Sequence, residues 1–304
     1  MATSIYHKPV MLNECMEALA INPSGKYVDV TFGGGGHSQA ILNMLNAEGK
    51  LIAFDQDKDA AANIISDKRL NFVPHNFRNL RRFLKVYDAD SANGYNGILA
   101  DLGISSYQID TPERGFSIRY EANLDMRMDA ALQTTAADIL NNYSAEQLQK
   151  ILSENGEVRN SKTLAQLIVS SRVEKPFSTT SEFIERIDSC IRGIRPRYLA
   201  QVFQALRMEV NQELQSLEEL LKQSSEVLQH GGRMVVLTYH SLEDRMVKNF
   251  FKSGNVNGEE NKDVFGNVRK PFTNFLKKPL TASEEEVREN PRARSAKLRV
   301  AIKN

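Results

Sequence analysis

Four short strand-like runs follow one another early in the chain, and helix-like stretches separate them. Strands that alternate with helices form βαβ units, and their right-handed crossovers build a parallel sheet with helices on both faces. We therefore predict an α/β fold with a doubly wound, Rossmann-like sheet. The four runs are Tyr27 to Thr31, Lys50 to Asp55, Leu70 to Pro74 and Tyr95 to Asp101.

The alternation stops after Asp101 and resumes only at a run from Gly231 to Tyr239, where the two leading glycines are expected to end a helix. Between these points, from Thr134 to about Arg192, apolar residues recur at helical spacing. Capping-box patterns occur there at Ser144 to Gln147 and at Thr179 to Glu182. We therefore predict an all-helical domain inserted into the sheet domain.

The insertion divides the chain into two expected domains, with a sheet domain of residues 1–108 and 198–304 and an inserted helical domain of residues 109–197. A long helix from Tyr198 to Gln229 is expected to lead back into the sheet. A further helix is predicted at residues 244–251, a polar and basic loop at about 253–282 and a last strand at residues 296–302.

Composition limits the class of protein and the kinds of site. The 304 residues suffice for one large or two ordinary domains, and no apolar run reaches the roughly 18 residues of a membrane helix. Without a visible secretory signal, the expected location is the cytoplasm, with no membrane partner. Cys15 and Cys190 stand far apart with no metal-binding spacing, which argues against a disulfide framework and a structural zinc site.

The glycine-rich turn within Asp29 to Ser38 lies where a strand gives way to a helix, so its backbone can approach a ligand closely. No lysine follows the glycines, which nearly excludes a nucleoside triphosphate, and the fit to a dinucleotide fingerprint is loose. S-adenosylmethionine is the third candidate, because nearby acids suit its cationic sulfonium. Asp55, about twenty residues after the glycines, is placed to accept ribose hydroxyls in either a nicotinamide or an S-adenosyl site.

Asp101 favours the S-adenosyl alternative. It ends the fourth strand, at the sheet edge where α/β proteins bind ligands, near Gly33 to Gly36. Hydride transfer needs no acid there, whereas an attacking amine must be aligned and must lose a proton. A helix N-cap is the structural alternative for this aspartate.

Nine segments make the chain resemble the bacterial small-subunit ribosomal RNA cytosine-N4 methyltransferase family, also called RsmH or MraW, over nearly its whole length. The segments are His7–Glu14, Thr31–Ser38, Ile52–Asp57, Asp101–Gln108, Arg114–Ser117, Leu124–Asp129, Phe203–Arg207, His240–Arg245 and Asn290–Ser295.

The resemblance implies a class I methyltransferase that uses S-adenosylmethionine to methylate the exocyclic N4 amine of one cytidine of 16S rRNA at the decoding centre. Its implied cofactor contacts are Gly35, Gly36, His37, Asp55, Phe77, Asp101 and Gln108. No metal is implied. The sequence leaves open whether the substrate is naked RNA or the small ribosomal subunit, and whether the enzyme forms a homodimer.

The acceptor side of the site is less constrained by the sequence. We predict that Asp101 orients the amine or accepts its proton, and that His240 contributes to catalysis at the same edge; a structural hydrogen bond is the alternative for His240. Candidate substrate contacts are Arg114, Phe116, Asp125, Arg127 and Ser241. For Arg114, Asp125 and Arg127, which lie at the junction with the insertion, buried ion pairing is the alternative. Neither cysteine lies in a candidate site, which favours direct attack by nitrogen over a cysteine nucleophile.

Basic segments interleaved with aromatic residues are candidates for contacts with the RNA backbone. They are Arg78 to Lys85 and Lys270 to Lys278, with Arg292 and Arg294. For each of the two longer segments taken alone, a solvated surface is an equally good interpretation. Two functions from other classes also remain open: a nicotinamide-dependent oxidoreductase and a noncatalytic RNA-binding factor.

Overall fold

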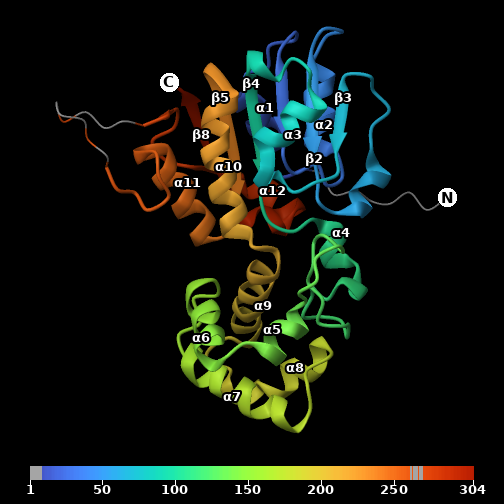
Figure 1. Cartoon of the computed structure of the whole chain (residues 1–304), viewed down its shortest axis with the longest axis vertical. Helices are drawn as coiled ribbons and strands as arrows, with labels where there is room; N and C mark the ends of the chain where they lie inside the picture. Colours follow the sequence, from blue (N-terminus) through green and yellow to red (C-terminus); the bar gives the residue numbers. More distant parts are fainter. Residues whose placement is uncertain (1–8, 261, 263–265, 267–269) are drawn as a thin grey trace. The chain divides into compact units, whose positions relative to one another are not determined.

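The strands predicted from the sequence form one mixed sheet in the computed structural model, which describes residues 9–260, 262, 266 and 270–304, without the side chain of Ser106 (Figure 1). The order is β3-β2-β1-β4-β5-β8-β6, and β7 also pairs with β8. The first five of these strands are parallel, whereas β8 runs antiparallel to β5. The strands are β1 (Lys26–Asp29), β2 (Lys50–Phe54), β3 (Leu70–Val73), β4 (Tyr95–Asp101), β5 (Leu228–Thr238), β6 (Phe272–Asn274), β7 (Leu280–Thr281) and β8 (Lys297–Lys303).

The strand order reverses at β1: β2 and β3 are added on one side of it, and β4 and β5 on the other. Loops after β1 and β4 therefore leave the sheet next to each other, which is where open α/β sheets bind ligands. The doubly wound fold predicted from the alternating pattern is confirmed.

Helices cover both faces of the sheet, and the alternation of side chains along the strands decides which residues meet them. In β4, Ile98 and Ala100 belong to the core formed with α3 (Leu80–Tyr87), α10 (Glu213–Val227) and α11 (Ser241–Ser253). Leu99 faces the opposite core, formed with α1 (Leu12–Leu19) and α2 (Gly36–Met44). The remaining elements of this unit are α12 (Glu284–Glu289), η1 (Lys58–Asn63), η2 (Phe77–Asn79), η3 (Ser91–Asn93) and η6 (Pro291–Ser295).

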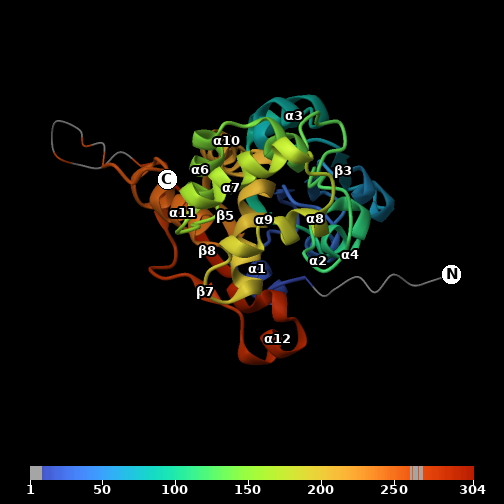
Figure 2. The same ribbon diagram turned by 90° about the horizontal axis from the view of Figure 1, so that it is seen from below.

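A second compact unit, residues 104–213, is helical and has its own core. Figure 2 shows α6, α7, α8 and α9 gathered in this unit. The capping box predicted at Ser144 is present, whereas at Thr179 only the hydroxyl half forms, because Glu182 reaches back to Ser178. Its elements are α4 (Ser106–Asp110), η4 (Pro112–Arg114), α5 (Ala136–Asn142), α6 (Ala145–Glu154), α7 (Ser161–Glu174), α8 (Thr180–Arg186), η5 (Asp188–Cys190) and α9 (Arg195–Asn211).

Four boundaries differ from the sequence expectation. The helical unit begins at Ile104 and not at residue 109. It ends at Glu213 and not at residue 197, because α9 buries its apolar side chains, among them Val202 and Leu206, in the helical core. The expected single helix of residues 198–229 is two helices, since Gln212 has left-handed backbone with φ 49°. Gly231 does not end a helix but lies inside β5, in a bulge where its φ of 79° is tolerated.

Some expectations concern residues outside the described part of the chain. His7 and Lys8, which begin the first family segment, are among these, and so is part of the loop expected at residues 253–282. Within the described part, no helix is both long enough and apolar enough to cross a bilayer.

Candidate active site

The glycine-rich turn is organised around the buried carboxylate of Asp29, the last residue of β1. The backbone N–H of Thr31 donates to its Oδ1 at 3.0 Å, and the Ser38 hydroxyl donates to its Oδ2 at 2.7 Å. These bonds join the strand end to the first turn of α2. Gly33 and Gly35 have φ values of 50° and 76°, which other residues rarely adopt, so the turn needs glycine at these two positions.

Asp55 follows β2 and faces the same turn. Its Oδ2 accepts a hydrogen bond of 2.7 Å from the backbone N–H of Gly33, and its Oδ1 accepts one of 2.8 Å from Asp57. Burial raises the pKa of Asp55 to about 6, although both hydrogen bonds act in the opposite direction. Each carboxylate oxygen keeps a further lone pair, so the group can still accept hydrogen bonds from a ligand's hydroxyls.

Asp101 ends β4 beside the turn, and three groups fix its position. Its backbone N–H donates to the Thr31 hydroxyl at 2.7 Å, and the Tyr239 hydroxyl donates to its Oδ1 at 2.6 Å. Its Oδ2 lies 3.7 Å from His37 Nδ1. The side chain remains 24% exposed, so it can meet a ligand.

Electrostatics at this edge favour a cationic ligand. Burial raises the pKa of Asp29 and of Asp101. At both carboxyls the interaction with His37 is the largest effect that lowers the pKa. A ligand with a positive charge would lower the cost of ionising these carboxyls, whereas a pyrophosphate would increase it. The residues present therefore fit the sulfonium and ammonium groups of S-adenosylmethionine better than a dinucleotide, which disfavours the oxidoreductase alternative.

A segment before α1 packs over the glycine turn. The His37 ring contributes Nε2 to a 3.1 Å hydrogen bond with the Val10 carbonyl. A Cβ added at Gly36 would lie 2.2 Å from Pro9 Cγ, so the contact depends on glycine. The Met11 N–H donates to Glu286 Oε1 at 2.7 Å, which ties this segment to α12.

The other predicted residues of the sheet unit lie near strand ends. Phe77 begins η2 after β3 and packs partly buried against the core. His240 is the N-cap of α11, where its Nδ1 accepts from the Glu243 N–H at 3.4 Å and its Nε2 lies 3.1 Å from Glu243 Oε1. Ser241 is exposed in the first turn of α11. The carboxyl ends of neighbouring strands thus bring together Asp29, Gly33, Gly35, Gly36, His37, Asp55 and Asp101.

Gln108 belongs to the helical unit, where it forms a capping box with Ser105 at the start of α4.

Arg127 forms a two-point ion pair with Asp125, with both hydrogen bonds at 2.7 Å. Burial acts to raise the pKa of Asp125, but the Arg127 bonds outweigh it and the pKa lies below its usual value.

The loop that carries this pair is fixed by two further side chains. The Arg114 guanidinium donates to the carbonyls of Arg127 and Met128. The guanidinium also lies over the ring of Phe116, 5.8 Å from its centroid, and that ring is buried in the helical core. The structure therefore shows these substrate candidates engaged in holding a loop within their own unit.

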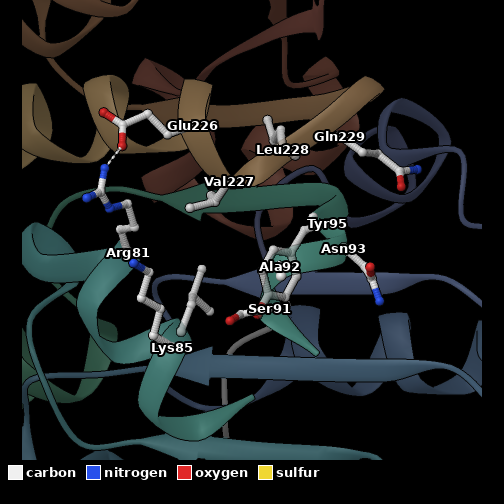
Figure 3. A pocket seen from close by; sticks show the side chains of 12 residues that line it. Arg81, Lys85, Ser91, Ala92, Asn93, Tyr95, Glu226, Val227, Leu228 and Gln229 are labelled. Atoms are coloured by element: carbon white, nitrogen blue, oxygen red, sulfur yellow. Dashed lines mark hydrogen bonds and ion pairs between the residues drawn. The ribbon is translucent and has the colours of Figure 1, made fainter. Parts of the chain in front are cut away.

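The basic segment of α3 is partly neutralised, since Arg81 forms an ion pair with Glu226 of α10. This pair borders a pocket of about 490 Å³ that Figure 3 shows from close by. Lys85 and Tyr95 also line it, and Tyr95 begins β4. The pocket is thus at the opposite end of β4 from Asp101 and is not the candidate active site.

Tyr239 is the residue of this site that sequence reasoning missed. The signal was present, because Tyr239 directly follows the fifth parallel strand, next to the predicted His240. Its importance depends on strand register, which pairs Asp101 with Leu237 and which the sequence does not display.

Comparisons with known proteins agree with this geometry. The model of the MraW methylase family matches residues 4–304. The protein named Ribosomal RNA small subunit methyltransferase H from Cytophaga hutchinsonii is 54% identical over 300 residues, covering 98% of this chain and 99% of that protein. Proteins of the same name from Phocaeicola vulgatus and Flavobacterium johnsoniae are 51% and 47% identical, each match covering 99% of both chains. The chain therefore belongs to the MraW methylase family.

Proposed function

We propose that this methylase transfers a methyl group to the N4 amine of one cytidine in 16S ribosomal RNA, at the decoding centre and within the small ribosomal subunit in the cytoplasm. S-adenosylmethionine, when bound, supplies the methyl group from its sulfonium. The observation that carries the proposal is the partly exposed carboxylate of Asp101, held beside the glycine turn and near two other acids that suit a cationic cofactor.

The cytosine amine is a weak nucleophile, because its lone pair is delocalised into the ring. A carboxylate that accepts a hydrogen bond from N4–H orients the amine and returns electron density to nitrogen. With the cofactor bound, the nitrogen lone pair would form the new bond to the methyl carbon, and the electron pair of the broken carbon–sulfur bond would stay on sulfur. In the proposed mechanism Asp101 Oδ2 accepts the proton that nitrogen gives up, since Oδ1 is occupied by Tyr239.

Cofactor contacts are proposed from the geometry of the glycine turn and Asp55, and from the family resemblance for Phe77. Asp55 accepts the ribose hydroxyls, Phe77 lies by the adenine, and Gly35 and Gly36 let the backbone approach the ligand. His37 orients the turn through its bond to Val10. Gln108 is proposed as a cofactor contact on the family resemblance alone.

The helical unit is proposed to recognise the RNA. Because Arg114, Phe116, Asp125 and Arg127 are engaged with one another or with loop carbonyls, their proposed role is to shape the loop that meets the substrate. A flipped cytidine also needs contacts on the sheet unit. We assign these to His240 and Ser241, because α11 begins at the carboxyl edge of the sheet.

The decisive assay uses tritiated S-adenosylmethionine with naked 16S rRNA, assembled small subunits or no RNA, followed by digestion and identification of the labelled nucleoside. We expect N4-methylated cytidine in at least one RNA mixture. Its absence from every mixture would refute the proposal. Stabilisation against heat by S-adenosylhomocysteine, but not by a nicotinamide dinucleotide, separates the methylase from an oxidoreductase, and label transfer separates it from a noncatalytic RNA-binding factor.

Asp101→Asn tests the assigned chemistry, because the amide keeps the shape of the side chain but cannot accept a proton. We expect turnover to fall by about a hundred-fold, within the range typical of a lost general base. Asp67→Asn is the matched control, since Asp67 pairs with Arg69 ahead of β3, outside the site. Full turnover by Asp101→Asn with cofactor bound would remove Asp101 from the chemistry.

A further inference from the structure

The position of Tyr239 follows from the register of two parallel strands. Asp101 of β4 pairs with Leu237 of β5. Side chains two residues apart on a strand point to the same face, so a long side chain at position 239 is a diagonal neighbour of Asp101. The tyrosine ring spans that gap, and its hydroxyl donates to Asp101 Oδ1 at 2.6 Å.

The surroundings leave the Asp101 carboxylate little freedom. Tyr239 is anchored through its own backbone N–H, which donates to Glu243 Oε2 at 3.0 Å. Gly103 has φ 96°, and a Cβ added there would lie 3.4 Å from Tyr239 Cδ2. The ring is thus packed beneath the chain that leaves β4, and the hydroxyl holds one oxygen of Asp101 while Oδ2 stays available.

We propose that Tyr239 is a positioning residue for methyl transfer, whose hydroxyl fixes the Asp101 carboxylate so that Oδ2 points at the acceptor amine. The inference rests on the proposed function of Asp101. It assigns to Tyr239 no contact with the cofactor or the RNA; the residue acts through Asp101 alone.

The same hydrogen bond affects the protonation of Asp101. Burial raises the pKa of Asp101, His37 from α2 and Tyr239 lower it, and Asp29 from β1 and Glu243 from α11 raise it. Cys15 of α1, which the sequence placed outside the site, lies within electrostatic range of it: burial and then the charge of Asp101 raise the thiol pKa well above its usual value.

The Tyr239 hydroxyl itself remains a donor. Burial, and then the charge of Asp101, raise the pKa of Tyr239 well above its usual value, so the phenol stays protonated at neutral pH. Removing the hydroxyl therefore raises the pKa of Asp101 further, and the reactive carboxylate appears only at a higher pH.

Tyr239→Phe removes the hydroxyl and keeps the ring. We expect the acid limb of the kcat profile to move upward by about one pH unit, so that kcat falls by up to about ten-fold on that limb and recovers at high pH. The KM for S-adenosylmethionine is expected to stay unchanged. Tyr95→Phe is the matched control, because Tyr95 donates a similar 2.8 Å bond to Asp88 at the other end of β4.

Either of two pH profiles of Tyr239→Phe would overturn the proposal: an unmoved acid limb, or an equal loss of kcat at every pH, which indicates a packing defect. In an Asp101→Asn background, Tyr239→Phe should lower the residual rate no further, and an additional ten-fold loss would contradict action through Asp101.

If Tyr239→Phe does not fold, 3-fluorotyrosine at position 239 keeps the ring and hydroxyl. As a stronger donor it should move the acid limb downward, and an unmoved limb refutes the role. If the wild-type enzyme forms no N4-methylated cytidine, it is the proposed function that is refuted, and this result is known before any variant is compared.

Discussion

Affinity for S-adenosylhomocysteine is expected to depend on pH through Asp55. Burial raises the pKa of this carboxyl to about 6, and both of its oxygens already accept backbone hydrogen bonds. The ionised form accepts hydrogen bonds from ribose hydroxyls better than the protonated form does. Binding therefore favours the carboxylate, and below about pH 6 it must release a proton.

The size of the effect follows from that pKa. A group with a pKa of about 6 is roughly nine-tenths ionised at pH 7 and one-tenth ionised at pH 5, so the Kd should rise about ten-fold between these pH values. Asp55→Asn removes the titration together with a charge-assisted hydrogen bond of about 1.5 to 3 kcal/mol. Its Kd should be about ten- to hundred-fold higher at pH 7 and nearly independent of pH.

Isothermal titration calorimetry from pH 5 to pH 8, in buffers with different ionisation enthalpies, measures both the Kd and the protons released. Asp67→Asn is the control, because hydrogen bonds from Arg69 lower the pKa of Asp67 to about 2, outside the titrated range. A wild-type Kd that is constant over this range, or an Asp55→Asn variant with wild-type affinity, would refute the assignment of Asp55 to the ribose.

The stability of the free protein should fall, not rise, with pH through Asp55, because the folded pKa of this group lies above its unfolded value of 3.8. The contribution of Asp55 to the free energy of unfolding is greatest below pH 3.8 and falls by up to about 3 kcal/mol as the pH rises through 6. Urea unfolding of wild type and Asp55→Asn at pH 4 and pH 7 measures this, and equal pH slopes would contradict it. Gly36→Ala should weaken S-adenosylhomocysteine binding about ten-fold, since its Cβ would displace Pro9 from the turn; an unchanged Kd in calorimetry would show that the contact is dispensable. Asn211→Ala should lower the free energy of unfolding by about 2 to 4 kcal/mol, because the buried amide satisfies the Met128 N–H at 2.7 Å; a loss below about 1 kcal/mol in urea unfolding would argue against that role.

The fold was predictable from the sequence wherever local chemistry decides structure. Alternating β-branched runs and helical stretches indicated the parallel strands, and acids at their ends, Asp29, Asp55 and Asp101, indicated the edge where a ligand binds. These inferences succeed because parallel strands in βαβ units place their carboxyl ends at one edge regardless of detail.

Features that depend on distant packing could not be predicted in this way. The break at Gln212 interrupts a pattern that is helical on both sides, and the sequence carries no proline or glycine there. For the loop around Arg114 and Arg127 the sequence left substrate contact and buried ion pairing as alternatives, and in the structure the guanidiniums are taken up by Asp125 and by backbone carbonyls. Pairing of this kind depends on loop conformation, which local propensity does not encode.

The tie between Met11 and Glu286 has a consequence for synthesis on the ribosome. Its partners are separated by 275 residues, so at about 5 to 20 residues per second about 14 to 55 seconds pass before the bond can form. During that interval the helical unit, one continuous stretch of chain with its own core, has all of its residues available, whereas β5 still lacks β8 beside it. The bond between Met11 and Glu286 is thus among the last to form, and the segment that covers the glycine turn is tied to α12 only after most of the chain has been made.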